Sequence, residues 1–127
     1  MESRLFGFLL DDDIQFDIAN KRLVRYQAET SENAMFFKVI TLNDVQLELL
    51  LLLLDNEPGT VVLKANIMRI WEEKSAYASN QRLCYLVKSL RNKLSSIGVS
   101  EKLISNAHGV GYFVDGCKVS PMFIGRE

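Results

Sequence analysis

The spacing of apolar residues changes near residue 41 from a strand period to a helix period, and this change limits the possible folds more than any other feature. Before it, four short β-rich runs occur: residues 5–9, 14–18, 23–26 and 36–40. The second of them alternates apolar and polar side chains strictly. Residues 19–22 supply a turn, and residues 27–33 form a polar loop. The sequence therefore predicts an amino-terminal antiparallel sheet with one apolar and one polar face.

Helical patterns follow this sheet. Asn43 and Gln46 fit a capping box just before a leucine-rich run, which predicts a first helix over residues 44–56. After a Pro-Gly pair and a brief extended piece at residues 61–62, a second helix is expected over residues 64–72. Its inner side holds Ile67, Met68, Ile70 and Trp71.

The third helix, expected over residues 79–95 with Ser79 or Asn80 as its cap, has an apolar side and a polar side. The apolar side holds Leu83, Val87, Leu90 and Leu94. The opposite side holds Gln81, Tyr85, Lys88 and Asn92, and Arg82 and Ser89 flank it. No Asp or Glu occurs from residue 79 to residue 100, whereas an ordinary solvated face mixes both signs.

Such a helix suits the major groove of DNA, which is about 12 Å wide, although an exposed polar helix without a partner is the alternative. Arg82 and Lys88 are the expected phosphate ligands. The uncharged members of the polar side could contact bases or hold the DNA backbone, and the sequence does not separate these roles. Arg91 lies beside the apolar side, where we expect an ion pair within the protein.

A hairpin with glycine at its turn closes the pattern. After a loop at residues 95–100 that contains Gly98, two strands are expected at residues 102–107 and 111–114. Sheet, three helices and hairpin follow one another in the order of a winged helix-turn-helix, an α+β fold. We expect one domain over residues 1–116 and a tail over residues 117–127.

The charge distribution and the cysteine content indicate which partner and which cellular compartment to expect. The formal net charge is −1, but residues 1–58 carry 11 acidic and 5 basic side chains, while residues 59–127 carry 5 acidic and 10 basic ones. This asymmetry indicates either an anionic partner for the basic half or an uneven surface without a role.

Cys84 and Cys117 allow at most one disulfide, which favours a reducing cytoplasm. No signal peptide is visible, and the longest apolar run is far shorter than the roughly 20 residues of a membrane span.

Five short motifs together resemble a known family. They are Ile-Thr-Leu-Asn at residues 40–43, Gly-Thr-Val-Val at 59–62, Trp71, Leu-Arg-Asn-Lys-Leu at 90–94, and Gly-Val-Gly-Tyr at 109–112. In this order and spacing the chain resembles the winged-helix effector domain of OmpR/PhoB-type response regulators, and most closely the one-component ToxR/CadC-like regulators. The resemblance covers the chain from the opening strands to about Val114.

The resemblance implies sequence-specific binding of double-stranded promoter DNA, with the third helix in the major groove and the hairpin wing on the adjacent minor groove or backbone. DNA-facing positions fall on Gln81, Arg82, Tyr85, Lys88 and Ser89 of the helix, and on Asn106 and His108 of the wing. Many members have Thr and Arg at those two wing positions, and a mostly neutral His neutralises phosphates less well than Arg. A single copy should therefore bind weakly and act as a homodimer on repeated half-sites. Residues 72–78 are the implied contact with RNA polymerase.

Other functions fit less well. A winged-helix module that binds protein and not DNA is the alternative, and the acidic amino-terminal half is consistent with it. One histidine, no clustered metal ligands, no phosphate-binding glycine loop and no nucleophile–base pair argue against an enzyme, a metal site and a cofactor. Asp11, Asp12 and Asp13 are expected to form a solvated turn.

The wider architecture is expected to lack a receiver domain, because Met1 lies directly before the sheet. The parent is then either a freestanding regulator or, as we expect from the resemblance, the cytoplasmic head of a membrane-anchored one, with residues 118–127 beginning the linker. The second helix also departs from the family, since Leu63 stands where Ser or Thr is the usual cap.

Overall fold

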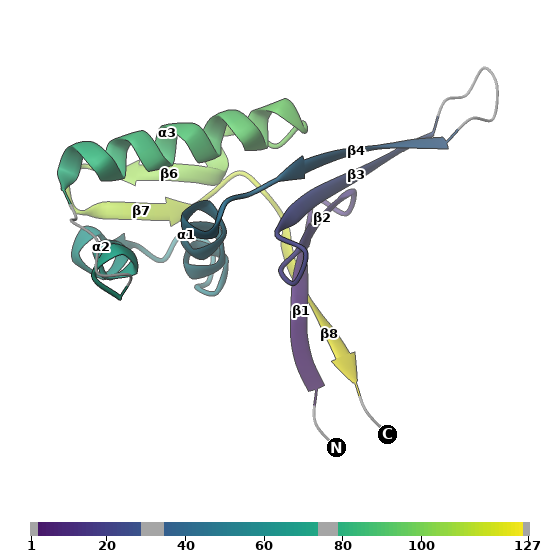
Figure 1. The fold of residues 1–127 in the computed structure, drawn as a ribbon, viewed down its shortest axis with the longest axis horizontal. Coiled ribbons are helices and arrows are strands. Elements are labelled where there is room, and N and C mark those ends of the chain that lie inside the picture. Colours follow the sequence, from purple (N-terminus) through teal and green to yellow (C-terminus); the bar gives the residue numbers. More distant parts are fainter. Residues whose placement is uncertain (1–2, 29–34, 74–78, 126–127) are drawn as a thin grey trace.

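The computed structural model describes residues 3–28, 35–73 and 79–125. The chain forms an amino-terminal sheet, three α-helices and a small carboxy-terminal sheet, so the α+β winged-helix fold expected from the sequence is confirmed (Figure 1). The helices are α1 (Asp44–Leu54), α2 (Lys64–Glu73) and α3 (Asn80–Ser96). A single turn of 3₁₀ helix, η1 (Glu101–Leu103), follows them.

The larger sheet has five strands in the order β4-β3-β2-β1-β8, all antiparallel. They are β1 (Ser3–Leu10), β2 (Ile14–Asp17), β3 (Arg22–Ala28), β4 (Met35–Thr41) and β8 (Val119–Gly125). The first four match the runs expected from the sequence. The turn between β1 and β2 holds the three aspartates, which are exposed as expected, and Asp11 and Asp12 adopt positive φ angles of 52° and 66°.

Strand β8 was not predicted. The sequence analysis assigned residues 117–127 to a tail, but Val119 pairs with Leu10 and Gly125 with Ser3, so this segment extends the amino-terminal sheet along β1. Pro121 concealed the strand, because proline cannot donate to a sheet ladder and usually argues against a strand. The position of β8 at the edge of the sheet explains why proline is tolerated there.

One face of the larger sheet packs against the helices. Phe8, Leu10, Ile14, Phe16 and Leu23 are each at most 3% exposed, and they belong to the same core as the buried leucines of α1 and α3. Alternation along each strand places these side chains on one face of the sheet. The hydrophobic core therefore joins the sheet to all three helices and fixes their relative positions.

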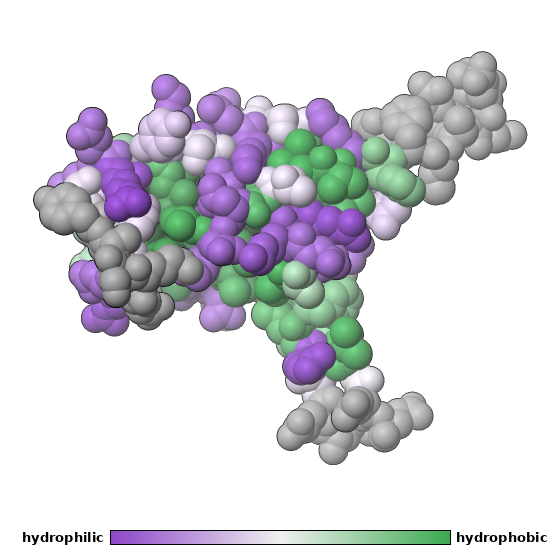
Figure 2. All heavy atoms as spheres, in the orientation of Figure 1, coloured by the Kyte–Doolittle hydropathy of each residue, from purple (hydrophilic) through white to green (hydrophobic). Residues whose placement is uncertain are grey.

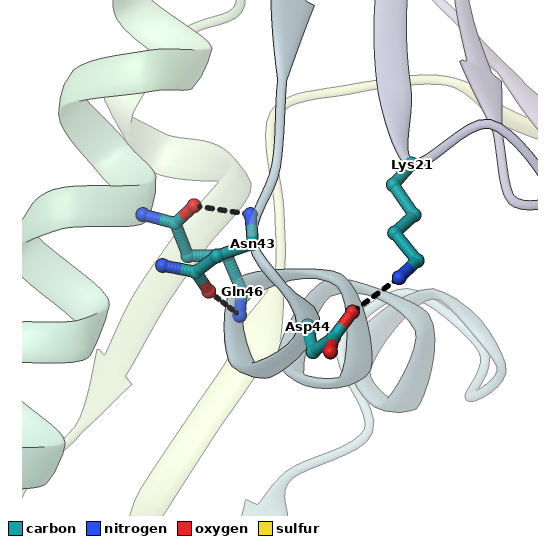
Figure 3. Close-up of polar contacts among 4 residues, drawn as sticks. All are labelled: Lys21, Asn43, Asp44 and Gln46. Carbon is teal, nitrogen blue, oxygen red and sulfur yellow. Dashed lines mark hydrogen bonds and ion pairs between the residues drawn. The ribbon is translucent and has the colours of Figure 1, made fainter.

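Helix α1 begins as predicted. The side-chain oxygen of Asn43 accepts a hydrogen bond from the Gln46 amide at 2.8 Å, and the Gln46 side-chain oxygen accepts one from the Asn43 amide at 3.0 Å (Figure 3). Lys21, in the turn before β3, pairs with Asp44 at 2.5 Å (Figure 3). The helix ends at Leu54, two residues before the predicted end.

The smaller sheet has the strand order β5-β7-β6, with β5 (Val62–Leu63), β6 (Ile104–Ala107) and β7 (Gly111–Val114). The β6–β7 hairpin is the predicted wing, although its first strand begins later than expected. Residues 101–103 form η1 instead, because the Ser100 hydroxyl caps this turn by accepting from the Lys102 amide at 3.2 Å. Leu63, where a helix cap is usual, is half-exposed and pairs with Gly111.

Helix α3 lies within one residue of its predicted bounds at each end. Ser79 is the cap, and its hydroxyl accepts a hydrogen bond from the Arg82 amide at 3.1 Å. The predicted apolar side is buried, and Leu86 joins it. Among the residues that the structure describes, no helix has the length and apolar character needed to cross a membrane.

Candidate nucleic-acid interface

The exposed side of α3 presents the polar residues that the sequence placed there. Gln81, Arg82, Tyr85, Lys88 and Asn92 are all exposed, and 75% of Tyr85 is accessible to solvent. In the view of Figure 2, hydrophilic side chains cover the outer edge of this helix. The arrangement offers hydrogen-bond donors and cations to a partner without any carboxylate from the same helix.

The four cations of α3 have different surroundings. Lys88 is exposed, and no described residue forms an ion pair or hydrogen bond with its ammonium group. The Arg82 guanidinium lies 5.6 Å from the centroid of the Trp71 ring, so a cation–π contact with α2 holds it at the amino-terminal end of α3. Arg91 and Lys93 both donate to groups inside the protein.

Arg91 joins the helix to the wing. Its Nε and Nη2 donate to the Ile104 carbonyl at 3.0 and 2.5 Å, and Nη2 also donates to the Asn106 side-chain oxygen at 3.2 Å. The guanidinium lies 6.0 Å from the centroid of the Tyr112 ring. The sequence predicted a structural role with an ion pair. The role is confirmed but the partner was wrong, because a backbone carbonyl and an amide oxygen of β6 take the place of a carboxylate.

Lys93 and Ser89 belong to a polar network beneath the helix. The Lys93 ammonium donates to the Thr41 carbonyl at 2.9 Å and to the side-chain oxygen of Gln46 at 2.7 Å. The Gln46 amide nitrogen in turn donates to the Ser89 hydroxyl at 3.2 Å, and that hydroxyl donates to the Leu86 carbonyl at 2.8 Å. Ser89 is half-buried and directed toward α1, unlike the other predicted DNA-facing residues of α3.

Sequence reasoning missed Gln46 and Lys93 as functional supports of this surface. Gln46 was recognised for its capping role alone, although it is only 4% exposed. The signal that could have found the network is the spacing of Ser89 and Lys93, which lie four residues apart and therefore on one flank of the helix. That flank faces the amino-terminal end of α1.

Asn106 and His108, the predicted DNA-facing residues of the wing, differ in the contacts that their side chains make within the protein. Asn106 is exposed, and its side-chain oxygen is occupied by Arg91, which leaves its amide nitrogen for another partner. His108 is exposed in the turn between β6 and β7, with a positive φ of 33°. The turn closes with a hydrogen bond of 2.9 Å from the Val110 amide to the Ala107 carbonyl. The wing lies beside α3 (Figure 1), and Arg91 bonds the helix to β6.

Close packing and burial explain the last two residues of the Gly-Val-Gly-Tyr motif in the wing, Gly111 and Tyr112. A Cβ atom at Gly111 would lie 2.0 Å from the Val62 carbonyl oxygen, so glycine lets β7 approach β5. Tyr112 is 6% exposed, and burial raises the pKa of its hydroxyl, with the neighbouring Cys84 adding to the effect and Arg91 opposing it. The ring therefore stays neutral and packs beneath Arg91 as part of the wing's support.

Comparisons with known proteins agree with this geometry. A family model described as "Transcriptional regulatory protein, C terminal" matches residues 38–114, which is more than half of the chain and runs from β4 to the end of β7. A comparison with curated protein sequences finds no match.

Two solved structures have the same fold. One is the DNA-binding domain of the response regulator AdeR in complex with an intercistronic region, with a TM-score of 0.60 at 21% identity, covering 82% of this chain and 95% of the other. The second is the C-terminal domain of NsrR, a lantibiotic response regulator of nisin resistance, with a TM-score of 0.50 at 25% identity, covering 70% of this chain and 90% of the other. The chain belongs to the family of transcriptional regulatory protein C-terminal domains.

Proposed function

We propose that α3 reads the major groove of duplex DNA and that the β6–β7 wing contacts the adjacent minor groove or backbone. The observation that carries this proposal is the exposed side of α3. It presents five polar or aromatic side chains, and no carboxylate occurs from Ser79 to Ser100. A carboxylate on this side would repel phosphates, whereas donors of this kind bind phosphate oxygens and base edges.

The side chains divide into two groups by chemistry. Lys88 and Arg82 are the phosphate ligands, because each carries a full positive charge at the surface. Gln81, Tyr85 and Asn92 contact bases or hold the backbone. Ser89 supports the helix and does not contact DNA, since its hydroxyl already bonds to Gln46 and Leu86. On the wing, His108 and the free amide nitrogen of Asn106 face the DNA.

A salt titration of duplex binding tests the proposal. Affinity should fall with salt on logarithmic axes, with a slope of about −0.9 per phosphate contact. Lys88→Ala should weaken binding to every duplex and reduce the slope by about 0.9, because it removes one phosphate ligand. Arg4→Ala, which removes an exposed charge from β1, is the matched control and should change neither quantity beyond a small screening effect.

Base contacts need a second comparison. Tyr85→Ala or Gln81→Ala should change the preference among duplexes, because a good base contact contributes about 1–3 kcal/mol of discrimination. If Lys88→Ala, Tyr85→Ala and Gln81→Ala each lose the same affinity on preferred and random duplexes, α3 contacts only the DNA backbone. Absence of binding to every duplex at low salt would refute DNA binding and leave the protein-interaction alternative.

The assembly on DNA is proposed as a homodimer on repeated half-sites. The support is the small number of exposed cations on the proposed interface, which makes the electrostatic affinity of one copy low. Two half-sites about 10–10.5 base pairs apart should therefore bind two copies more tightly than one half-site predicts. Analytical ultracentrifugation on duplexes with one and two half-sites measures this, and equal affinity per copy on both would contradict pairing.

The remaining partners rest on the resemblance. The connection over residues 72–78 is the proposed contact with RNA polymerase; Glu72 is exposed at the end of α2, and residues 74–78 lie outside the described part of the chain. The closest relation is proposed to be with ToxR/CadC-like regulators, which places a membrane anchor beyond Glu127. The reading frame after Glu127 tests this, because an anchor needs an apolar stretch of about 20 residues.

A further inference from the structure

Two positive side chains lie directly opposite each other on β3 and β4. Arg25 and Lys38 are register partners, and like charges in this position destabilise a sheet. Both side chains, however, donate to the carboxy-terminal end of α3. The Arg25 Nη1 donates to the Ile97 carbonyl at 3.1 Å, and the Lys38 ammonium donates to the Ser96 carbonyl.

The end of α3 is a suitable acceptor for two cations. The last carbonyls of a helix have no partners within the helix, and the helix dipole gives this end a partial negative charge. Lys93 is the only basic residue in the last turn, and its ammonium donates instead to Thr41 and Gln46. Arg25 and Lys38 therefore bring two further positive charges directly to the carbonyl groups at the end of the helix.

Two neighbouring residues favour this contact. Asp13, in the turn after β1, pairs with the Arg25 guanidinium at 3.3 Å and so orients it. Gly98 follows the helix with a φ of 95°, and a Cβ atom there would lie 1.8 Å from the Arg25 Nη1. Glycine at this position thus serves both the left-handed backbone and the space that the guanidinium fills.

We propose that Arg25 and Lys38 are positioning residues that hold the carboxy-terminal end of α3 on the amino-terminal sheet and thereby set the angle at which the helix meets DNA. This inference rests on the proposed function of α3. The helix is about 25 Å long at 1.5 Å per residue, so a small rotation at one end moves the groove-facing side chains along its length. Base contacts tolerate displacements of only about 0.5 Å, whereas long side chains follow a phosphate over a wider range. Loss of the two cations should therefore reduce selectivity more than overall affinity.

The test uses duplexes chosen by the protein itself. The wild-type chain selects from a library with about 20 randomised base pairs, and the enriched duplex is compared with a shuffled duplex of the same composition. The double variant Arg25→Ala/Lys38→Ala should lower the ratio of the two affinities about tenfold, while affinity for the shuffled duplex changes far less.

Arg22→Ala is the matched control for Arg25→Ala. It removes the same charge from the same strand, but alternation places Arg22 on the opposite face, where it pairs with Asp17 at 3.3 Å. Its selectivity ratio should stay at the wild-type value. Arg25→Lys retains the charge and one donor, and should restore part of the ratio. Thermal unfolding of each variant shows that it is folded before binding is compared.

A measurement without DNA separates the positioning role of Arg25 and Lys38 from the proposed DNA binding by α3. Residual dipolar couplings report the orientation of α3 relative to the sheet, and amide exchange reports the stability of residues 96–99. Both should change in the double variant and stay unchanged in Arg22→Ala. If the helix orientation and the selectivity ratio both match the control, the positioning role is wrong while DNA reading stands. If the wild-type chain prefers no duplex, the proposed function fails, and the couplings still decide whether the two cations hold the helix.

Discussion

At the scale of single residues, Gln46 determines how α3 sits on the fold. Its side-chain oxygen accepts from the Asn43 amide and the Lys93 ammonium, and its nitrogen donates to Ser89. A buried amide with partners at both ends fixes one geometry, because each donor or acceptor left alone in the core is unfavourable. One residue therefore both begins α1 and supports the underside of α3.

Replacement of Gln46 should destabilise the whole domain. Gln46→Ala leaves the Lys93 ammonium and the Asn43 amide each with one partner fewer in a half-buried place, and we expect a loss of about 2–4 kcal/mol in the free energy of unfolding. Urea denaturation measures it. Gln81→Ala is the matched control, since the same change on the exposed side should stay within about 0.5 kcal/mol. Similar values for the two variants would contradict the supporting role.

His108 is the wing residue whose replacement should strengthen DNA binding. His108→Arg adds a permanent charge at the tip of the wing, so affinity for all duplexes should rise at low salt and the salt slope should steepen by about 0.9. His108→Asn controls for the backbone, because asparagine tolerates the positive φ of 33° without adding charge. A gain in both variants would attribute the effect to the turn and not to phosphate binding.

At the scale of elements, the wing depends on how closely β7 approaches β5. Gly111→Ala places a Cβ atom 2.0 Å from the Val62 carbonyl oxygen, a backbone atom that cannot rotate away. We expect a loss of about 3 kcal/mol or more in unfolding free energy. Gly109→Ala has open space but a φ of 78°, and should lose only about 1–2 kcal/mol. Equal losses in thermal or urea unfolding would show that the contact between β7 and β5 does not by itself require glycine at residue 111.

Local signals made most elements predictable. The Asn43–Gln46 capping box and the spacing of Leu83, Val87, Leu90 and Leu94 each depend on residues within one or two helical turns, so sequence alone revealed them. The exposed set on α3 followed from the same periodicity. Strand β8 could not be predicted in this way, because it pairs with β1 across more than a hundred residues and carries a proline. The contacts of Ser89, Arg91 and Lys93 depend on α1, β6 and Thr41, and helix periodicity alone does not specify such partners.

At the scale of the whole molecule, the distribution of charge matters more than the net charge of −1. The three aspartates after β1 lie in a turn of the larger sheet, where Asp12 pairs with Lys118 and Asp13 with Arg25. These carboxylates thus join segments of the fold, and α3 itself carries no Asp or Glu. A slightly acidic domain can therefore carry a helix whose exposed side has no carboxylate, as the proposed DNA interface requires.

The contact between the turn after β1 and the residues just before β8 can be tested through the thiol of Cys117. Cys117 precedes β8, and burial raises the pKa of its thiol to about 12, with the nearby Asp11 and Asp13 carboxylates adding to the effect. The folded chain therefore retains the proton over a range in which the unfolded thiol, with an ordinary pKa of 9.0, releases it. Stability from this group is fully present below pH 9.0 and is lost as the pH rises toward about 12, because ionisation then favours the unfolded chain.

The free energy of unfolding should accordingly fall between pH 8 and pH 11 more steeply in the wild-type chain than in Cys117→Ala, with the pH values chosen as rough brackets of that window. Urea denaturation across the window measures the difference, and the raised pKa of Tyr112 affects both chains alike. If the wild-type chain and Cys117→Ala have the same slope, the Cys117 thiol is open to solvent, and the contact of β8 with the acidic turn is looser than the structure describes. A steeper fall in the wild-type chain alone ties the carboxy-terminal strand to the first turn of the sheet, and hence to Asp13 and Arg25 at the end of α3.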